Sequence, residues 1–295
     1  MKGSKAMPLL AYLTCAIVWG STYFAIALGL ESFTPYGMVA ARFTIGGILA
    51  LGLGFLRKEP PLRKSDWPHL LLVGALLLAG SNALVSWAEL HVTSGMAAII
   101  CAMVPVFLAL FSGESIGLRT WMGLLLGLVG VGVLANPLAG KIHLGGVAAL
   151  LLATMIWSFG TLHGKHTIQG TSYMKQVGVQ MLTAASIGLV VAPLSGGYLH
   201  HDLTPKAALA VGYLALFGSL LAFTAYIYLA RVWSPAKMGT YTYINPVVAL
   251  LLGGLFLNEP FSLRMGLGLI VILAGIALVQ LKPAGSRKQG EEISA

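Results

Sequence analysis

Apolar runs of about 20 residues recur along the whole chain and are separated by short polar connections. A run of this length forms a helix that can cross roughly 30 Å of hydrocarbon. Run length, charged residues and Pro/Gly clusters predict ten spans, at 8–30, 34–56, 67–88, 94–112, 117–136, 144–163, 173–194, 206–229, 236–257 and 262–281. The predicted fold class is therefore an all-α integral membrane protein with ten transmembrane helices.

The composition agrees with a lipid bilayer as the main partner of the chain. Of 295 residues, 57% are hydrophobic and 9% are charged, whereas a soluble domain carries roughly a quarter charged residues. The first run follows Lys2 and Lys5, as in a signal peptide, but it extends from Pro8 to Leu30 and is predicted to stay as a helix. We expect a multi-pass protein of the cell (inner or plasma) membrane.

The formal net charge of +9 raises nucleic-acid binding as one interpretation. When alternate connections are assigned to opposite sides, however, most Lys and Arg residues fall on one side. The other side has only Lys141, Lys206 and Arg264, and Arg42 lies within a span. The positive-inside rule then places the basic side and both termini in the cytoplasm. No nucleic-acid partner is predicted.

Similar landmarks recur in the same order in the two halves of the chain, which indicates an internal repeat. The matched pairs are Trp19 with Trp157, Pro105 with Pro246, Glu114 with Glu259, Gly123 with Gly266, and Gly132 with Gly275. Because five spans is an odd number, two such halves must have opposite orientations in the membrane. The predicted units are a first repeat at 8–137, an inverted second repeat at 142–281 and a cytoplasmic tail at 282–295.

The ordered motifs resemble the drug/metabolite transporter superfamily, and in particular its ten-helix carriers with two EamA-type repeats. The matching residues are Trp19-Gly20-Ser21-Thr22, Pro35, Ala41-Arg42-Phe43, Ser234-Pro235-Ala236, Asn245-Pro246-Val247-Val248-Ala249, Gly253-Gly254 and Asn258-Glu259-Pro260. The halves differ, since Gln180 stands where the first half has Arg42, and Ser94 or Gly95 stands where the second has Pro235. The resemblance implies a carrier that moves small metabolites, commonly outward.

Polar and aromatic residues near mid-span are the candidates for a substrate cavity, because an unpartnered polar group is costly in hydrocarbon. Arg42 is the strongest candidate, since a charge at the centre of a span costs roughly 2.5–3.5 kcal/mol on insertion scales. It either binds a substrate carboxylate or gates the path, or else snorkels outward or bonds helix-end carbonyls. The full predicted substrate-binding set is Trp19, Ser21, Tyr23, Arg42, Asn82, Trp87, Trp157, Ser219, Tyr241 and Asn245.

For most of this set, core packing, headgroup anchoring and hydrogen bonding between helices stay open as alternative roles. Pro105 and Pro246 are predicted to kink two spans and to serve as a hinge or gate, or only to help packing.

All acidic residues fall in loops, tails or span ends. Glu89 with His91 is therefore the best protonatable pair, unless it is simply a solvated helix end.

Two further features are interpreted structurally. Glu114 and Glu259 are expected to accept hydrogen bonds from loop amides or to pair with Arg119 and Arg264. The glycines of the fifth and tenth spans, Gly123, Gly127, Gly130, Gly268 and Gly275, allow close helix packing within the subunit or in a homodimer. The histidines lack the spacing of a zinc site, so neither metal nor cofactor is predicted.

These features favour a secondary transporter, specifically an exporter of small metabolites such as amino acids, working by alternating access around a central cavity. The rival hypotheses are an intramembrane enzyme and a passive channel. An enzyme needs a nucleophile with a base, or paired metal ligands, at matching depth, and the spans offer neither. A channel needs a charge ring or a filter sequence, and a primary pump needs a P-loop; the chain shows none of these.

Overall fold

The structure of the protein is a computed structural model that describes residues 6–112, 118–135, 143–168, 170, 172–233 and 238–280. Within these residues the secondary structure is helical, apart from one isolated β-bridge between Phe33 and Leu199. The α-helices are α1 Ala6–Gly29, α2 Pro35–Leu56, α3 Trp67–Val73, α4 Asn82–Glu89, α5 Ser94–Cys101, α6 Val104–Phe111, α7 Leu118–Ala135, α8 Leu144–Thr167, α9 Tyr173–Leu194, α10 Pro205–Tyr213, α11 Ala222–Val232, α13 Asn245–Phe256 and α14 Leu263–Gln280.

Several of these α-helices join end to end into longer helical segments that can span a membrane. Seven described segments have the required length and hydropathy: Ala6–Gly29, Pro35–Leu56, Lys64–Glu89, Ser94–Phe111, Leu144–Thr167, Tyr173–Leu194 and Pro205–Val232. Two shorter apolar segments, Thr240–Phe256 and Leu263–Gly275, follow, and α7 adds 18 residues. All lie within a few residues of the ranges predicted from the sequence. The total of ten spans and the side of the termini stay predictions.

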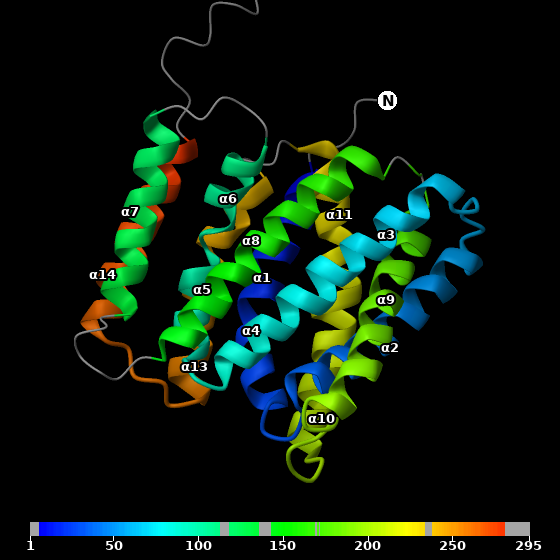
Figure 1. Cartoon of the computed structure of the whole chain (residues 1–295), viewed down its shortest axis with the longest axis horizontal. Helices are drawn as coiled ribbons and strands as arrows, with labels where there is room; N and C mark the ends of the chain where they lie inside the picture. Colours follow the sequence, from blue (N-terminus) through cyan, green and yellow to red (C-terminus); the bar gives the residue numbers. More distant parts are fainter. Residues whose placement is uncertain are drawn as a thin grey trace, which may run out of the picture.

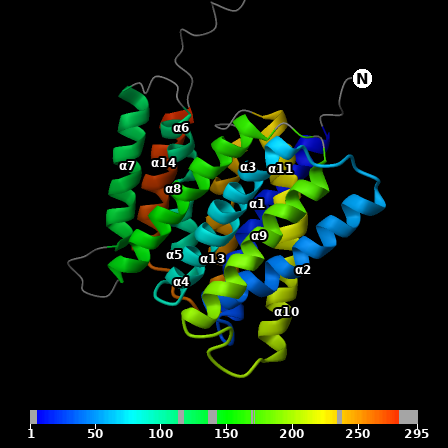
Figure 2. The same ribbon diagram turned by 45° about the vertical axis from the view of Figure 1, so that its right-hand side comes forward.

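Figures 1 and 2 show a bundle with a helix pair at each edge. The helices α7 and α14 pack along each other at one edge, and α2 and α9 at the other, with the remaining helices between them. The first turn of α1 and the last turn of α14 lie at the same end of the bundle, the upper end in Figure 1. The helices between the two pairs, together with the inward faces of α2 and α9, can therefore surround a cavity.

The two halves of the chain carry equivalent elements. When the halves are aligned without a gap on Trp19 and Trp157, α1 matches α8 and α2 matches α9 at both ends of each helix. Each half also has a π-helical segment of eight residues, at Gly74–Ser81 and Leu214–Leu221. Nothing in the sequence had pointed to these π-helical segments, which insert an extra residue into a helical turn.

The glycines of α7 and α14 form a seam within the chain. A Cβ atom at Gly275 would lie 2.7 Å from the Gly123 carbonyl oxygen, and one at Gly130 would lie 3.1 Å from that of Gly268. Across the two helices, Gly275 therefore contacts Gly123, and Gly130 contacts Gly268. The predicted correspondence of Gly123 with Gly266, and of Gly132 with Gly275, between the two repeats is a separate relation and stays a prediction.

The seam also bears on the predicted homodimer. The glycine faces are used to bring α7 and α14 together within one subunit, as the sequence allowed. The outer faces of the two helices are apolar and exposed, for example at Leu125 and Ile270. A dimer through these helices stays a prediction, and it would have to use those outer faces.

The prolines begin helices instead of kinking them. Pro105 lies in the first turn of α6, after a break that follows Cys101, and Pro246 lies in the first turn of α13. A first-turn proline is tolerated because its missing N–H would have no intrahelical partner there. The predicted mid-helix kinks are thus corrected to breaks between helices, and the role of hinge or gate stays a prediction.

Glutamates close two helix N-termini, as was expected for Glu259. The Glu259 carboxylate accepts hydrogen bonds from the Ser94 N–H (2.8 Å) and the Gly95 N–H (3.2 Å) at the start of α5. Glu59 does the same for the Met174 N–H at the start of α9. A carboxylate at this position satisfies free amides and faces the positive end of the helix dipole. The corresponding prediction for Glu114 lies outside the described residues.

The glycine seam yields a stability prediction. We expect Gly275→Leu and Gly130→Leu to destabilise the protein by at least about 1–3 kcal/mol, because each side chain would overpack against backbone. The measurement is the thermal unfolding midpoint of the purified protein in detergent. Gly52→Leu is the matched control, since nothing lies within 4 Å of a Cβ atom at that helical glycine. Equal midpoints for all three variants would contradict the seam.

Candidate functional site

A cavity in the middle of the bundle has a volume of about 90 Å³. Its walls come from α1, α2, α4, α8 and the segment from Tyr241 into α13, with contributions from the break between α5 and α6. We call it the central cavity. Predicted substrate-binding residues in its lining are Trp19, Tyr23, Arg42, Asn82, Trp157, Tyr241 and Asn245.

Several lining residues were not predicted, namely Thr22, Ile26, Ser81, Val85, Cys101, Val104, Thr154 and Thr242. Apolar, thiol and hydroxyl side chains such as these are common throughout the spans, so only their depth and helix face distinguish them. That information requires the helix packing.

The Arg42 side chain lies inside the protein and faces the central cavity. The residue is 4% exposed, so it does not snorkel outward. Its Nε donates to Ser219 Oγ at 3.0 Å, and its Nη1 donates to Asn82 Oδ1 at 3.3 Å. Both acceptors are neutral, and the described part of the chain gives Arg42 no carboxylate partner. A buried cation without a counter-charge is strongly unfavourable.

Both acceptors of Arg42 are associated with the π-helical segments. Ser219 lies within Leu214–Leu221, and Asn82 directly follows Gly74–Ser81. The amide nitrogen of Asn82 donates to the Leu77 carbonyl at 2.8 Å, so that its oxygen is turned toward the guanidinium. Widened turns of this kind often mark functional sites because they redirect a side chain.

Four aromatic residues, Trp19, Trp157, Tyr226 and Tyr241, pack together at one side of the central cavity, and we call them the aromatic cluster. The ring centroids of Trp19 lie 5.3 Å from Trp157, 5.0 Å from Tyr226 and 5.2 Å from Tyr241. The Trp157 Nε1–H donates to the Tyr226 hydroxyl at 3.0 Å. These tilted and edge contacts and the hydrogen bond fix the rings as one wall.

A second cavity lies on the other side of the aromatic cluster. It has a volume of about 310 Å³ and is bounded by α3, α8, α9 and α11. Trp157 lines the central cavity, whereas its partner Tyr226 lines the second. The aromatic cluster therefore separates the two spaces, and nothing in the sequence had indicated the second.

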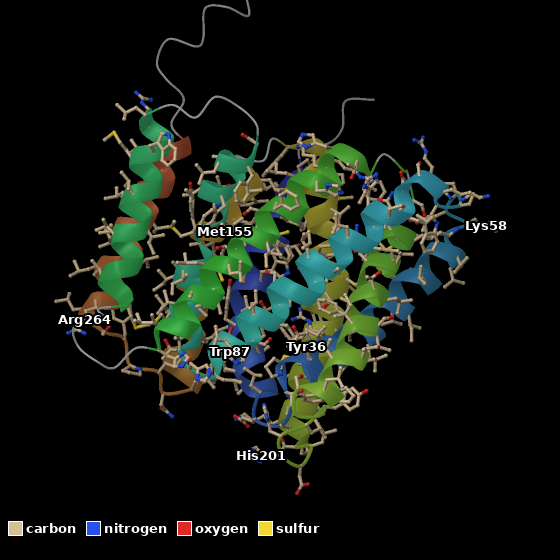
Figure 3. All side chains as sticks on the ribbon, viewed as in Figure 1. Tyr36, Lys58, Trp87, Met155, His201 and Arg264 are labelled. Atoms are coloured by element: carbon tan, nitrogen blue, oxygen red, sulfur yellow. The ribbon has the colours of Figure 1, made fainter. Side chains whose placement is uncertain are left out.

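Three of the predicted substrate-binding residues do not line the central cavity. Ser219 only holds Arg42, as described above. Ser21 bonds the Val18 carbonyl at 2.7 Å and the Tyr213 hydroxyl at 2.6 Å. Trp87 is 38% exposed, lies near the lower end of the bundle in Figure 3 and packs on the His91 ring at a centroid distance of 4.7 Å.

Within the described residues, Glu89 and His91 form neither a hydrogen bond nor an ion pair with each other. His91 stacks on His143 with ring centroids 4.1 Å apart. Both Glu89 carboxylate oxygens are buried and have no hydrogen-bond partner among the residues that the structure describes, so Glu89 is not a solvated helix end. Its electrostatic neighbours include Glu259, Tyr23 and Cys101. Within the residues that the structure describes, no group of His, Cys, Asp and Glu is suited to a metal ion.

Comparison with known proteins agrees with the sequence resemblance. The profile of the EamA-like transporter family matches residues 6–136 and 144–281. The uncharacterized inner membrane transporter YedA of Escherichia coli is 38% identical over 291 residues, covering 95% of this chain and 93% of its own length. A probable terminal-alkyne amino-acid exporter of Streptantibioticus cattleyicolor is 28% identical and covers 98% of both chains.

A solved crystal structure shares the fold with a TM-score of 0.69, at 21% identity, over 93% of this chain and 96% of the other. The two family matches cover nearly all of the chain, and the relatives extend over the same length. The protein is a multi-pass transporter of the inner membrane, and it belongs to the EamA-like transporter family of the drug/metabolite transporter superfamily.

Proposed function

We propose that this protein is a secondary transporter that exports small amphipathic metabolites bearing a carboxylate, such as amino acids, by alternating access. The observation that carries the proposal is the buried guanidinium of Arg42, which faces the central cavity with neutral partners only. A substrate carboxylate would provide the missing negative charge through a charge-assisted, often bidentate, hydrogen bond.

The aromatic cluster supports the same substrate class. Three of its rings, Trp19, Trp157 and Tyr241, line the central cavity together with Arg42, where their faces can contact the apolar part of a small metabolite. One relative is named as an exporter of an amino acid, which agrees with a carboxylate and an apolar body in one molecule.

Two cavities separated by a wall suit alternating access. The central and second cavities lie on opposite sides of the aromatic cluster, and a carrier needs one site that is exposed to either side in turn. A passive channel requires a continuous path, which the hydrogen bond from Trp157 to Tyr226 interrupts. The relatives are named as transporters, so an intramembrane enzyme is the weaker alternative.

We further propose ten spans in two inverted repeats, with both termini in the cytoplasm. The helices α1 and α8 occupy equivalent positions in the two halves and run in opposite directions (Figure 1). Lys58 lies at one end of the bundle, and His201 and Arg264 lie toward the other (Figure 3). The connection that holds Lys58 also carries Arg57, Arg63 and Lys64. The positive-inside rule makes the Lys58 end cytoplasmic.

Substrate class is tested by counterflow into proteoliposomes with panels of amino acids, sugars and cationic drugs. We expect uptake of carboxylate-bearing compounds. Arg42→Gln should raise the apparent KM for them at least about tenfold, the equivalent of roughly 1.4 kcal/mol. Arg42→Lys should give an intermediate loss because a lysine keeps the charge without the planar fork.

The matched control is Arg63→Gln, which removes an exposed arginine outside the spans, and it should transport as the unaltered protein does. Normal transport by both Arg42 variants at equal expression would overturn the substrate role of Arg42. No uptake of any class by well-folded protein would favour the enzyme alternative.

Orientation is tested by cysteine labelling in a background from which Cys15 and Cys101, the two cysteines of the chain, are removed. We expect a membrane-impermeant maleimide to label His201→Cys in intact cells and Lys58→Cys only after permeabilisation. Both positions are exposed. Labelling of both variants, or of Lys58→Cys alone, in intact cells would refute the proposed topology.

Coupling to protons is proposed through Glu89, because a charged carboxylate that is buried without hydrogen bonds is costly and a bound proton removes that cost. Imposing a pH gradient on proteoliposomes should then change the transport rate, and Glu89→Gln should abolish the response. The exposed Glu31, whose partner is Lys206, gives the control variant Glu31→Gln. Transport that is indifferent to the gradient would refute the coupling.

A further inference from the structure

The second cavity is the repeat-related counterpart of one part of the central cavity. The alignment that matches Trp19 with Trp157 also matches lining residues of the two cavities. It pairs Thr22, Tyr23, Ile26 and Arg42 of the central cavity with Gly160, Thr161, Gly164 and Gln180 of the second, in that order. In an inverted repeat, equivalent surfaces face opposite sides of the membrane. The second cavity is therefore a second site on the same path. It lies nearer the Lys58 end, because its lining includes the last turns of α8 and α11, which are at the upper end of the bundle in Figure 1.

We infer that the second cavity is an anion site that binds the substrate carboxylate at the Lys58 end of the path, before the substrate passes the aromatic cluster. This inference rests on the proposed function, since it assigns the ligand class and the order of contacts for the same transported molecule.

Two cations give the second cavity its charge. Arg231 and Lys165 are in its lining, and the described residues provide neither with an ion-pair partner. The Arg231 guanidinium stacks on the Tyr173 ring at 3.9 Å and donates to the Gln176 side-chain oxygen. Lys165 Nζ donates to the Trp233 carbonyl at 2.7 Å. Both cations are held in place by neutral groups, which leaves donors available to an anion.

Two glutamines add unpartnered polar atoms. Gln176 and Gln180 are each 1% exposed and line the second cavity. Within the described part of the chain, Gln176 Nε2 and Gln180 Oε1 are buried without a hydrogen-bond partner, which is costly unless a ligand or water supplies one. A donor beside two cations fits a carboxylate, and an acceptor deeper in the helix pair fits the ammonium group of an amino acid.

Two acidic groups lie close by, and neither is in the cavity lining. A Cβ atom at Gly170 would lie 2.7 Å from both Asp66 Oδ2 and Gln176 Nε2, so the buried Asp66 is near Gln176. The Glu59 carboxylate is already used by the amides of Met174 and Lys175 at the start of α9. The two cations, in contrast, line the cavity itself. The potential inside the second cavity is expected to be positive.

The electrostatic potential inside the second cavity is probed with charged thiol reagents on the full-length protein. Ala230→Cys, in a background without Cys15 and Cys101, puts a thiol in the cavity lining and keeps all four polar side chains. Two methanethiosulfonates are applied from the Lys58 side: the anionic 2-sulfonatoethyl reagent and the cationic 2-(trimethylammonium)ethyl reagent. The rate at which each modifies the thiol is divided by its rate with free cysteine. We expect the anionic reagent to be favoured at least roughly fivefold.

The preference should fall in Lys165→Gln and Arg231→Gln, and should persist in Arg63→Gln, which removes an exposed cation at the same end. Equal rates, faster reaction with the cation, or no modification from the Lys58 side would overturn the inference. These rates need no substrate, so a failure of the counterflow test would be distinguished from a failure of this site.

The ligand class is tested by protection of the same thiol. A mixture of neutral L-amino acids should slow modification, whereas the corresponding amino-acid amides, which lack the carboxylate, should not. Protection by amino acids alone supports the assignment. Equal protection by both mixtures, or protection by neither, would overturn the carboxylate as the recognised group.

Discussion

The hydrogen bonds of Arg42 to Ser219 and Asn82 are the constraint on which the site depends. They hold a guanidinium inside a membrane bundle without neutralising its positive charge. A negatively charged ligand can therefore supply the missing counter-charge. Ser219 belongs to the second half of the chain and Asn82 to the first, so the arginine joins the two repeats at the cavity. A movement of one half relative to the other must then change the surroundings of this cation, which gives a carrier a way to make substrate affinity depend on its conformation.

Close packing around the central cavity is made possible by glycine. A Cβ atom at Gly218 would meet Thr22 Cγ2 at 2.8 Å and an Arg42 nitrogen at 3.3 Å, and the carbonyl of the same residue accepts the Trp19 indole N–H at 2.9 Å. One small residue thus leaves room for the cation and orients an aromatic ring of the cavity wall. The paired helices at the two edges of the bundle are packed through glycines as well, which leaves the central helices as the elements whose rearrangement would open a path.

The spans, the repeat and the family could be predicted because they depend on run length, charge distribution and motif order, all of which are local properties of the sequence. Arg42 and Trp19 stood out for the same reason, since a charge or an indole at mid-span is unusual. The second cavity could not be predicted, because it depends on which faces of four helices meet. The same limit explains Trp87, which lies in an apolar run but faces outward, and Glu89, which lies at a helix end but is buried. The π-helical segments have no sequence signature that distinguishes them from the turns around them.

The two repeats share a backbone but not a charge pattern, and this asymmetry has a mechanistic consequence. At the position of Arg42 the second half has Gln180, while its cations, Lys165 and Arg231, lie closer to the Lys58 end. If the halves were chemically identical, a carboxylate would meet equivalent surroundings from either side. Here it would meet two partly accessible cations at one end and a single deeply buried one beyond the aromatic cluster. A site that gathers anions loosely on one side and desolvates them in the middle favours loading from the Lys58 end, which is the arrangement expected of an exporter when that end is cytoplasmic.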